Sequence, residues 1–457
     1  MAKNIDMTGG GSLSRKIILF ALPLMASGVV QQSFNSVDVA VVGRFVGHHA
    51  LAAVGANGPV IGLIVNLFIG VSVGANVVIA TCLGQRNERD TARAVSTSML
   101  IAAIGGIILT CIGLLVAGPM LRALDTPDAI VDDAANYLRI FSLGFMPMLL
   151  YNFGSAVLRS IGDTRRPFYW LVAGGLVNVA LNLLFVIVLK MGVHGVATAT
   201  VISNIVSSSG IISVLIREHG PIRLDLRHLR VWGTQFKKIM QIGVPAGVQG
   251  MVFALSNVFI QSAINGFGTE AIAGSAAAIN FEIYSYFILT AFVQACVAFM
   301  SQNYGAGLYS RCRKVYRRCM LMGAVGCGSV NLLIYFFHVY CIEIFTTDPQ
   351  AIAFATERIS TVLIWQWIAS SYEISGAALR SLGYSLTPTV FTILGTCVVR
   401  VGWVWAAHFT SFSELLRVYP ITWTLTGIAV VAAWFWVAHR RLNRPDHILP
   451  GSPSPAA

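Results

Sequence analysis

The sequence predicts an all-α membrane protein in which twelve transmembrane helices form two six-helix bundles related by a pseudo-twofold axis along the membrane normal. Three observations predict this fold: the composition, the number of long apolar runs, and a repeat between the two halves of the chain. The chain has 457 residues, of which 56% are hydrophobic and only 11% are charged. Soluble domains carry about 25% charged residues, so a chain this apolar needs a lipid bilayer as its solvent.

Twelve apolar runs are each long enough to cross about 30 Å of hydrocarbon, which takes roughly 20 helical residues. Only helices and closed barrels satisfy the backbone hydrogen bonds in lipid, and continuously apolar runs exclude the alternating strands of a barrel. In chain order, the predicted spans are residues 15–43, 50–80, 92–118, 133–159, 166–190, 194–216, 236–264, 271–300, 315–340, 352–379, 386–408 and 417–439.

Basic residues alternate between rich and poor segments along the first six spans. The N-terminal segment and the segments after the second, fourth and sixth spans are rich in Lys and Arg. The segments after the first, third and fifth spans hold one basic residue each, namely Arg44, Arg122 and Lys190. By the positive-inside rule the rich segments are cytoplasmic, which places the N-terminus inside the cell.

The second half of the chain continues this alternation. Basic residues gather after the eighth span and after the twelfth, whereas the segment after the ninth span is acidic, with Glu343 and Asp348. We therefore expect a multi-pass protein of the cell inner membrane with both termini in the cytoplasm. The formal net charge of +12 lies in these short clusters, so it does not predict nucleic-acid binding.

The two halves resemble each other at an offset of about 221 residues. Leu158–Gly162 (LRSIG) matches Leu379–Gly383 (LRSLG), and Pro167 matches Pro388. Each repeat holds six spans, and because six is even both halves have the same orientation. Two such bundles can rock against each other to give alternating access. The predicted parts are an N-terminal bundle at 1–216, a cytoplasmic linker at 217–235, a C-terminal bundle at 236–441 and a disordered tail at 442–457.

Asp38 is the first of three acids that lie far from any predicted span end, where an ionisable side chain costs roughly 3 kcal/mol or more. Gln31, Asn35 and Asp38 are spaced so that they share one face of the first span. A carboxyl group held away from water favours its neutral form, which suits proton loading and release. We predict that Asp38 and Asn35 take part in ion coupling; the alternative is a carboxylate locked by hydrogen bonds. Pro23 lies upstream and permits a bend.

Asn178 and Asn182 form a polar stripe on the fifth span, because they are separated by four residues. We predict that they hydrogen-bond Asp38 across the N-terminal bundle and contribute to ion coupling. The alternative is that they only hold helices together, as asparagines often do in membranes.

The second half carries three further ionisable candidates within its spans. Glu282 is predicted to contact substrate, with structural pairing as the alternative. Glu373 either contacts substrate or pairs with Arg380 on the same span. Arg400 is the only basic residue that the predicted spans place deep in the bilayer, away from the span ends. We predict that it either pairs with an acid or contacts an anion. The remaining predicted substrate contacts are Gln31, Phe34, Asn66, Gln249 and Asn257.

Several functions are excluded by what the full sequence lacks. It has no G-x-x-x-x-G-K-[ST] motif, so it is not predicted to be a self-powered ATP pump. His48, His49 and His338 lack metal-ligand spacing, and no catalytic constellation supports an intramembrane enzyme. We expect a monomer without cofactors or bound metal that is not an enzyme, and whose partners are small molecules, an ion and the bilayer.

Three motifs and the six-plus-six repeat resemble the multidrug and toxic compound extrusion (MATE) family, and the DinF-like bacterial branch is the best match. This resemblance covers nearly the whole chain and implies antiport of diverse, often cationic or aromatic, compounds in exchange for H⁺ or Na⁺. The motifs are Gln31–Gly43 (QQSFNSVDVAVVG) with Leu51–Gly55 (LAAVG), Leu158–Pro167 (LRSIGDTRRP) and Gln302–Gly307 (QNYGAG).

The resemblance also implies residue roles, with one departure. In the family an aspartate in the first span is the coupling acid, and Asp38 matches it; Asn178 matches an asparagine of the fifth span. The family often has an aspartate four residues later, where this chain has Asn182. The loss of that charge weakens the expectation of Na⁺ and favours H⁺. The closest alternative is a flippase for lipid-linked precursors, which would favour many basic residues for a pyrophosphate group.

Overall fold

The structure is a computed structural model that describes residues 5–123, 126–406, 409 and 411–446. Each predicted span falls on one helix or on consecutive helices. The first half comprises α1 (Leu13–Phe45), α2 (His48–Ala56), α3 (Gly58–Gly84), α4 (Glu88–Ala123), α5 (Asp128–Ser142), α6 (Phe145–Ser160), α7 (Arg165–Asn182), the π-helix η1 (Leu183–Val188) and α8 (Gly192–Arg217).

The second half begins after the linker, which holds the short helix η2 (Gly220–Ile222). It comprises α9 (Gly233–Asn265), α10 (Thr269–Gly305), α11 (Tyr309–Phe336), α12 (His338–Glu343), α13 (Pro349–Thr361), the 3-10 helix η3 (Leu363–Ile368), α14 (Ala369–Ser381), α15 (Leu386–Thr392), the π-helix η4 (Ile393–Val398), α16 (Val399–Ala406), α17 (Phe412–Leu416) and α18 (Val418–Leu442).

The predicted fold class, an all-α membrane protein with twelve spans, is confirmed. In the described part of the chain, 10 helices are long and apolar enough to cross a membrane. Helices α5 and α6 meet at 45° and together make an eleventh. The predicted span at 352–379 is divided among α13, η3 and α14. The sequence did not indicate this division, because the apolar run continues through the 3-10 turn.

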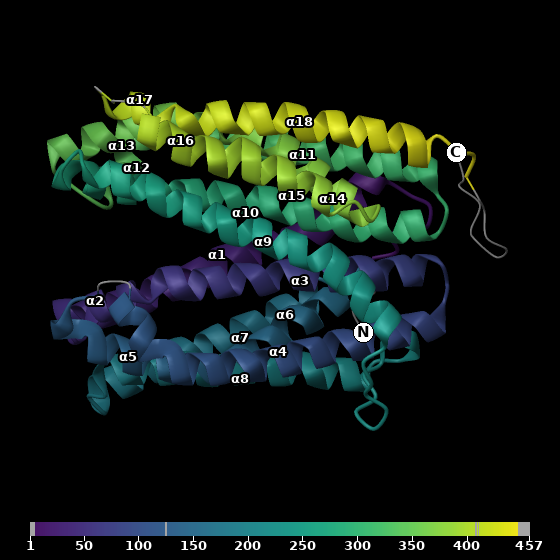
Figure 1. The fold of residues 1–457 in the computed structure, drawn as a ribbon, viewed down its shortest axis with the longest axis horizontal. Coiled ribbons are helices and arrows are strands. Elements are labelled where there is room, and N and C mark those ends of the chain that lie inside the picture. Colours follow the sequence, from purple (N-terminus) through teal and green to yellow (C-terminus); the bar gives the residue numbers. More distant parts are fainter. Residues whose placement is uncertain (1–4, 124–125, 407–408, 410, 447–457) are drawn as a thin grey trace.

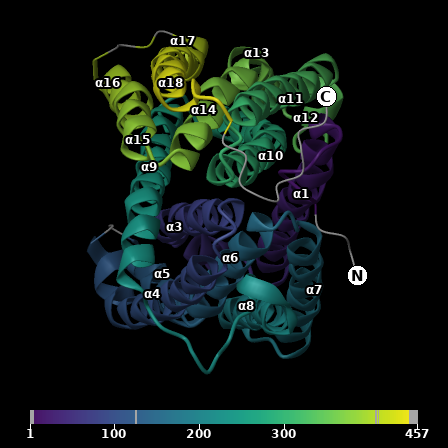
Figure 2. The same ribbon diagram turned by 90° about the vertical axis from the view of Figure 1, so that its right-hand side faces the viewer.

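Two groups of helices lie side by side, α1–α8 and α9–α18, which we name the N-bundle and the C-bundle (Figure 1). Figure 2 shows α9 reaching from the C-bundle onto the N-bundle, where it packs along α3, and α1 lying beside α10 on the other side. The predicted residue limits of the bundles and linker stay a prediction. Of the predicted tail, residues 447–457 lie outside the described residues.

Glycines bring α3 and α9 into backbone contact. A Cβ on Gly70 would overlap the backbone of Gly247, and a Cβ on Gly74 would overlap the backbone of Gly243. Small residues at these positions let two membrane helices approach closely, which is how helices associate where hydrophobicity offers no driving force. The crossing of α3 and α9 is therefore a fixed contact between the two bundles.

Gly247→Val is expected to destabilise the protein, because the added side chain meets the main chain of Leu67 rather than a flexible side chain. Overpacking of this kind costs about 1–3 kcal/mol. Thermal denaturation in detergent should show a clear fall in melting temperature. Gly402→Val is the matched control, since a Cβ at Gly402 meets no atom within 4 Å. Equal melting temperatures for the two variants would contradict the close crossing.

The bundles are also tied together at the end that holds the linker, which we name the linker end. Here the segment before α1 bridges them: Ile5 N–H donates to Gly162 O in the N-bundle (3.4 Å), while Asn303 Nδ2 donates to Met7 O (3.1 Å). Arg311 of α11 donates to Gly9 O (2.7 Å), and Met7 is 1% exposed. This segment therefore stabilises contact between the bundles at the linker end.

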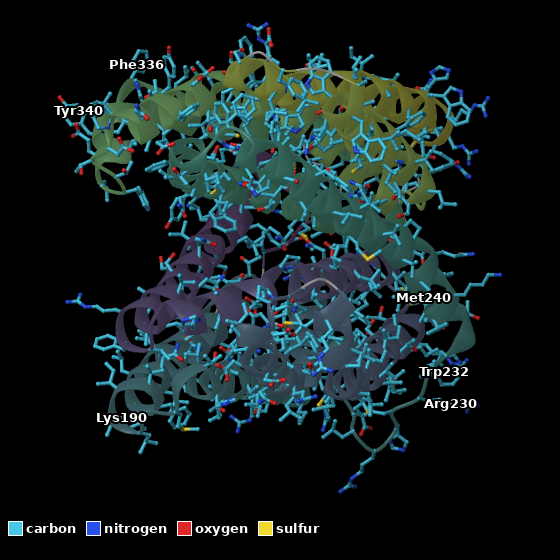
Figure 3. The ribbon with its side chains drawn as sticks, turned by 60° about the vertical axis from the view of Figure 1, so that its left-hand side comes forward. Lys190, Arg230, Trp232, Met240, Phe336 and Tyr340 are labelled. Atoms are coloured by element: carbon cyan, nitrogen blue, oxygen red, sulfur yellow. The ribbon has the colours of Figure 1, made fainter. Side chains whose placement is uncertain are left out.

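The opposite end of the molecule has a different arrangement. Figure 3 places Lys190 of the N-bundle and Tyr340 of the C-bundle at this end, where the ribbons diverge, and Arg230 and Trp232 at the linker end. Among the described residues, the hydrogen bonds that join the bundles all lie at the linker end, and they include the bond from Gln235 Nε2 to Asp90 Oδ1 (3.1 Å). The bundles are thus held together at one end and separate toward the other.

Candidate functional site

A polar cluster lies inside the N-bundle, where α7 passes into η1. Asn182 is fully buried, and its Nδ2 donates to Asp38 Oδ1 and to Asn178 Oδ1, the latter at 3.3 Å. Asn178 in turn donates to Thr200 Oγ1 of α8 (3.4 Å). The predicted hydrogen bond between Asp38 and the fifth span is confirmed, through Asn182. The functional roles of these residues stay a prediction.

The backbone irregularity beside this cluster is part of its construction. Asn182 is the last residue of α7, and the π-helix Leu183–Val188 follows it directly. Single π-turns within α-helices often lie at functional sites, since they shift the side chains that precede them. Here the irregularity ends the regular helix at the residue that reaches Asp38.

Asn182 can hold Asp38 in either protonation state. Its Oδ1 is buried and has no hydrogen-bond partner. The amide nitrogen donates to Asp38 in the structure, a contact that suits an ionised carboxylate. Rotation of the amide by half a turn would turn Oδ1 toward a protonated carboxyl group, whose hydrogen bond it could accept. The cluster therefore supplies a matching partner before and after a proton binds.

The other predicted residues of the first span lie apart from this cluster. Gln31 and Asn35 are exposed, although their spacing from Asp38 predicted a shared face. Phe34 packs its ring against α7 at Gly175, where an added Cβ would overlap the ring. Only Asp38 among these four reaches the buried amides.

A second cluster lies within the C-bundle around a buried ion pair. Arg358 of α13 is 2% exposed and makes a bidentate contact with Glu282 of α10, with Nε–Oε1 at 2.7 Å and Nη2–Oε2 at 3.0 Å. Tyr419 lies 5.5 Å from the Arg358 guanidinium and 4.5 Å from that of Arg400. Arg400 donates to Asn257 Oδ1 (3.0 Å). Two predicted substrate residues, Glu282 and Asn257, thus belong to one charged cluster.

Arg400, which the sequence places deep in a span, is buried, and the sequence did not indicate that Arg358 and Arg380 are buried as well. Arg358 and Arg380 are 2% and 7% exposed, and Arg400 is 0% exposed. Arg358 and Arg380 lie nearer to helix ends, but their long side chains turn into the bundle toward Glu282 and Gln249 rather than out to water. Sequence reasoning missed Arg358; its position inside a predicted span was the signal for a buried partner.

Glu373 and Gln249 meet around Arg380. Arg380 Nη2 donates to Gln249 Oε1 (2.7 Å), and Tyr286 Oη donates to Glu373 Oε1 (3.3 Å). The charge of Arg380 acts on Glu373 without a direct ion pair between them among the described contacts. Asn66 lies elsewhere, on α3 at the crossing with α9, where its Cβ is 3.5 Å from the position of a Cβ on Gly250.

The structure therefore divides the predicted site residues among separate places. Asp38, Asn178 and Asn182 form the N-bundle cluster, and the C-bundle holds the clusters around Arg358 and Arg380. The charged groups of all three clusters lie inside the bundles, which is where membrane proteins keep the ionisable residues of transport pathways.

A family model described as MatE matches residues 23–184 and 245–405. The chain belongs to the MatE family. The two matched segments correspond to the two halves of the repeat, so each six-span half resembles the same MatE unit. The family membership predicted from the sequence motifs is confirmed, while assignment to the DinF-like branch stays a prediction.

Relatives of the chain are named as multidrug resistance proteins or transporters. A probable multidrug resistance protein, YoeA of Bacillus subtilis, is 27% identical over 438 residues, which is 93% of this chain and 94% of the relative. An FAD transporter of Shewanella oneidensis is 22% identical over 91% of this chain and 93% of its own length. The protein is thus a multi-pass membrane protein of a multidrug efflux family.

A solved structure supports the fold. A crystal structure of MATE in complex with MaL6 aligns with a TM-score of 0.90 at 22% identity, covering 97% of this chain and 100% of that chain. The two-bundle MatE architecture is therefore common to both proteins.

Proposed function

We propose that the protein is a proton-driven antiporter that exports small organic molecules by alternating access, with Asp38 as the coupling acid. The observation that carries this proposal is the contact of Asp38 with the buried amide of Asn182 inside the N-bundle. A carboxyl group enclosed by amides can change its charge without losing its hydrogen-bond partner. Asn35 and Asn178 are proposed to assist in ion coupling.

The coupling step follows from what protonation does to this contact. When Asp38 is ionised, it accepts a hydrogen bond from the side-chain N–H of Asn182. A proton entering from outside neutralises the carboxylate, and the amide turns its oxygen to the new O–H group. Pro23 interrupts the backbone hydrogen bonds of α1 between the linker end and Asp38, and this permits the helix to bend. We propose that α1 moves relative to α7, the bundles rock, and the substrate leaves.

We propose that the linker end lies in the cytoplasm, as the positive-inside rule predicts. Under this proposed orientation the bundles are held together on the cytoplasmic side, and we propose that this arrangement is the outward-facing state of an inner-membrane protein. The bridge from Ile5 to Gly9 must release Asn303 and Arg311 before the cytoplasmic side can open.

The coupling ion is proposed to be H⁺. The N-bundle cluster offers one carboxylate, with Asn178 and Asn182 as its amide neighbours. Hard cations prefer several oxygen ligands with carboxylate charge among them. The single charge of the cluster is enough to bind a proton and offers a cation such as Na⁺ little compensation for dehydration.

Substrates are proposed to bind between the bundles. Candidate contacts are Gln31, Phe34, Asn66, Gln249, Asn257, Glu282 and Glu373. The protein is proposed to act as a monomer without cofactors. A flippase for lipid-linked precursors is the second candidate, favoured by the three buried arginines of the C-bundle. Since Arg358 is paired with Glu282 and Arg380 is bound by Gln249, Arg400 alone among these three arginines is left for a pyrophosphate, which favours the exporter.

Proteoliposomes with imposed gradients test the proposed function. With a dye or drug panel on the side of the linker end, a pH gradient that is acidic on the opposite side should drive export, and a Na⁺ gradient at uniform pH should not. The alternatives separate clearly: transport driven only by Na⁺ would overturn the choice of ion, and transport of a lipid-linked precursor alone would favour the flippase.

A further inference from the structure

Arg400 is a buried guanidinium without a counter-charge. It is 0% exposed, and its Nη1 and Nε donate to Asn257 Oδ1 (3.0 Å) and Thr422 Oγ1 (3.4 Å). Its Nη2 has no hydrogen-bond partner, and no carboxylate of the described residues lies against it. Burying an ion costs several kcal/mol when no opposite charge compensates it. Because no anion among the described residues compensates this charge, a bound anion would stabilise it.

The neighbouring charged residues do not neutralise Arg400. Both oxygens of Glu282 are taken by Arg358, whose guanidinium also lies 5.5 Å from the Tyr419 ring. Arg358 also retains one N–H group, at Nη1, without a partner. Two guanidiniums therefore lie over the same aromatic ring, and among the described residues the carboxylate of Glu282 is bound by Arg358 alone. The cluster has one positive charge in excess and two unused N–H donors.

Asn257 places this charge close to the surface that the C-bundle turns toward the N-bundle. Gly243, Gly250 and Asn257 are spaced seven residues apart and so share one face of α9. Gly243 contacts α3, and Gly250 lies beside Asn66 of α3, so this face is the one directed at the N-bundle. Asn257 lies two turns beyond Gly250, toward the end where the bundles diverge, and its side chain is half-buried.

We propose that the C-bundle binds an anionic group of the exported molecule, a carboxylate or a phosphate monoester, with Arg400 as its counter-charge behind Asn257. Guanidinium groups bind both anions through paired, charge-assisted N–H donors. Phe253, which is half-buried and whose ring lies 5.0 Å from the guanidinium, offers aromatic surface to a planar substrate. This inference rests on the proposed function and extends its substrates to zwitterions and organic anions.

Riboflavin and flavin mononucleotide are suitable probes, because these fluorescent molecules differ only by a phosphate monoester. Binding of each to purified protein in detergent can be followed by fluorescence anisotropy. We expect the wild-type protein to bind the mononucleotide about tenfold or more tightly, as one charge-assisted contact predicts. Arg400→Gln should bring the two affinities to within about twofold of each other.

Asn257→Asp is the sharper variant, since it supplies the missing carboxylate within the chain. It should abolish the preference for the mononucleotide and raise the melting temperature, so the test survives if Arg400→Gln does not fold. Asn265→Asp makes the same change on an exposed part of α9 and should keep the preference. Equal or undetectable binding of both flavins by the wild type, or an undiminished preference in Asn257→Asp, would overturn the proposal.

Failure of this site is distinguishable from failure of the proposed function. Asp38→Asn should keep the preference for the mononucleotide while losing proton-coupled export. If Asp38-dependent export persists and the wild type shows no preference, only the anion site is wrong. If the preference is present without proton coupling, the site exists and the coupling mechanism is wrong.

Discussion

Asp38→Asn is expected to abolish the export gradient while leaving the protein folded. A proton that falls through 100 mV supplies about 2.3 kcal/mol, and a tenfold difference in proton concentration adds about 1.4 kcal/mol. One proton can therefore sustain a gradient of several hundredfold in a neutral compound at most. Without an ionisable group at position 38, proton movement can no longer drive substrate export. The substrate gradient should therefore fall to that of protein-free vesicles.

The fold should survive this substitution because asparagine has the size of aspartate and its Oδ1 can still accept the hydrogen bond from Asn182. Substrate accumulation in inverted membrane vesicles measures the effect, and thermal denaturation checks the fold. Glu343→Gln removes an exposed carboxylate of the C-bundle and serves as the matched control. Wild-type accumulation by Asp38→Asn would show that another group couples the ion.

Glu282→Gln is expected to cost about 3–5 kcal/mol of folding free energy, because it leaves the buried Arg358 without its counter-charge. The melting temperature in detergent should fall further than for any surface substitution. The double variant Glu282→Leu/Arg358→Leu should recover most of this loss, since replacing a buried ion pair with apolar groups is often neutral.

Transport by the double variant then separates two roles of Glu282. Export at the wild-type rate would show that the pair serves only the structure of the C-bundle. A stable double variant that fails to export would support Glu282 as a substrate contact. A single variant as stable as the wild type would contradict the buried ion pair itself.

Much of the fold could be predicted from the sequence, because the bilayer restricts what an apolar chain can do. Each of the twelve apolar runs had to be helical, and the repeat at Pro167 and Pro388 fixed the number of bundles. The contact of Asp38 with Asn182 was also predictable, since buried polar groups in lipid seek one another. The same reasoning leaves open which partner each group finds.

The C-bundle shows where sequence reasoning failed. Arg358 stood near the beginning of a span, where an arginine usually extends to water, yet the structure turns it inward to Glu282. Pairing with Arg380 was one of two alternatives for Glu373, and Arg380 bonds Gln249 of α9. Both outcomes depend on which helices pack together, and hydropathy and spacing along one helix do not contain that information.

The irregular helices could not be predicted from the sequence either. The π-helices at Leu183–Val188 and Ile393–Val398 lie within uninterrupted apolar runs, so no change of composition marks them. The π-helix after Asn182 adjoins the coupling cluster, and the other precedes the helix of Arg400. In both places the irregularity lies beside a buried polar group.

Counting protons during substrate movement tests the central claim most directly. Proteoliposomes with a pH indicator inside, no membrane potential and a substrate gradient should show protons moving opposite to the substrate in the wild type, and no proton movement in Asp38→Asn. Proton movement at the wild-type rate in Asp38→Asn, or substrate movement without protons in the wild type, would contradict the account.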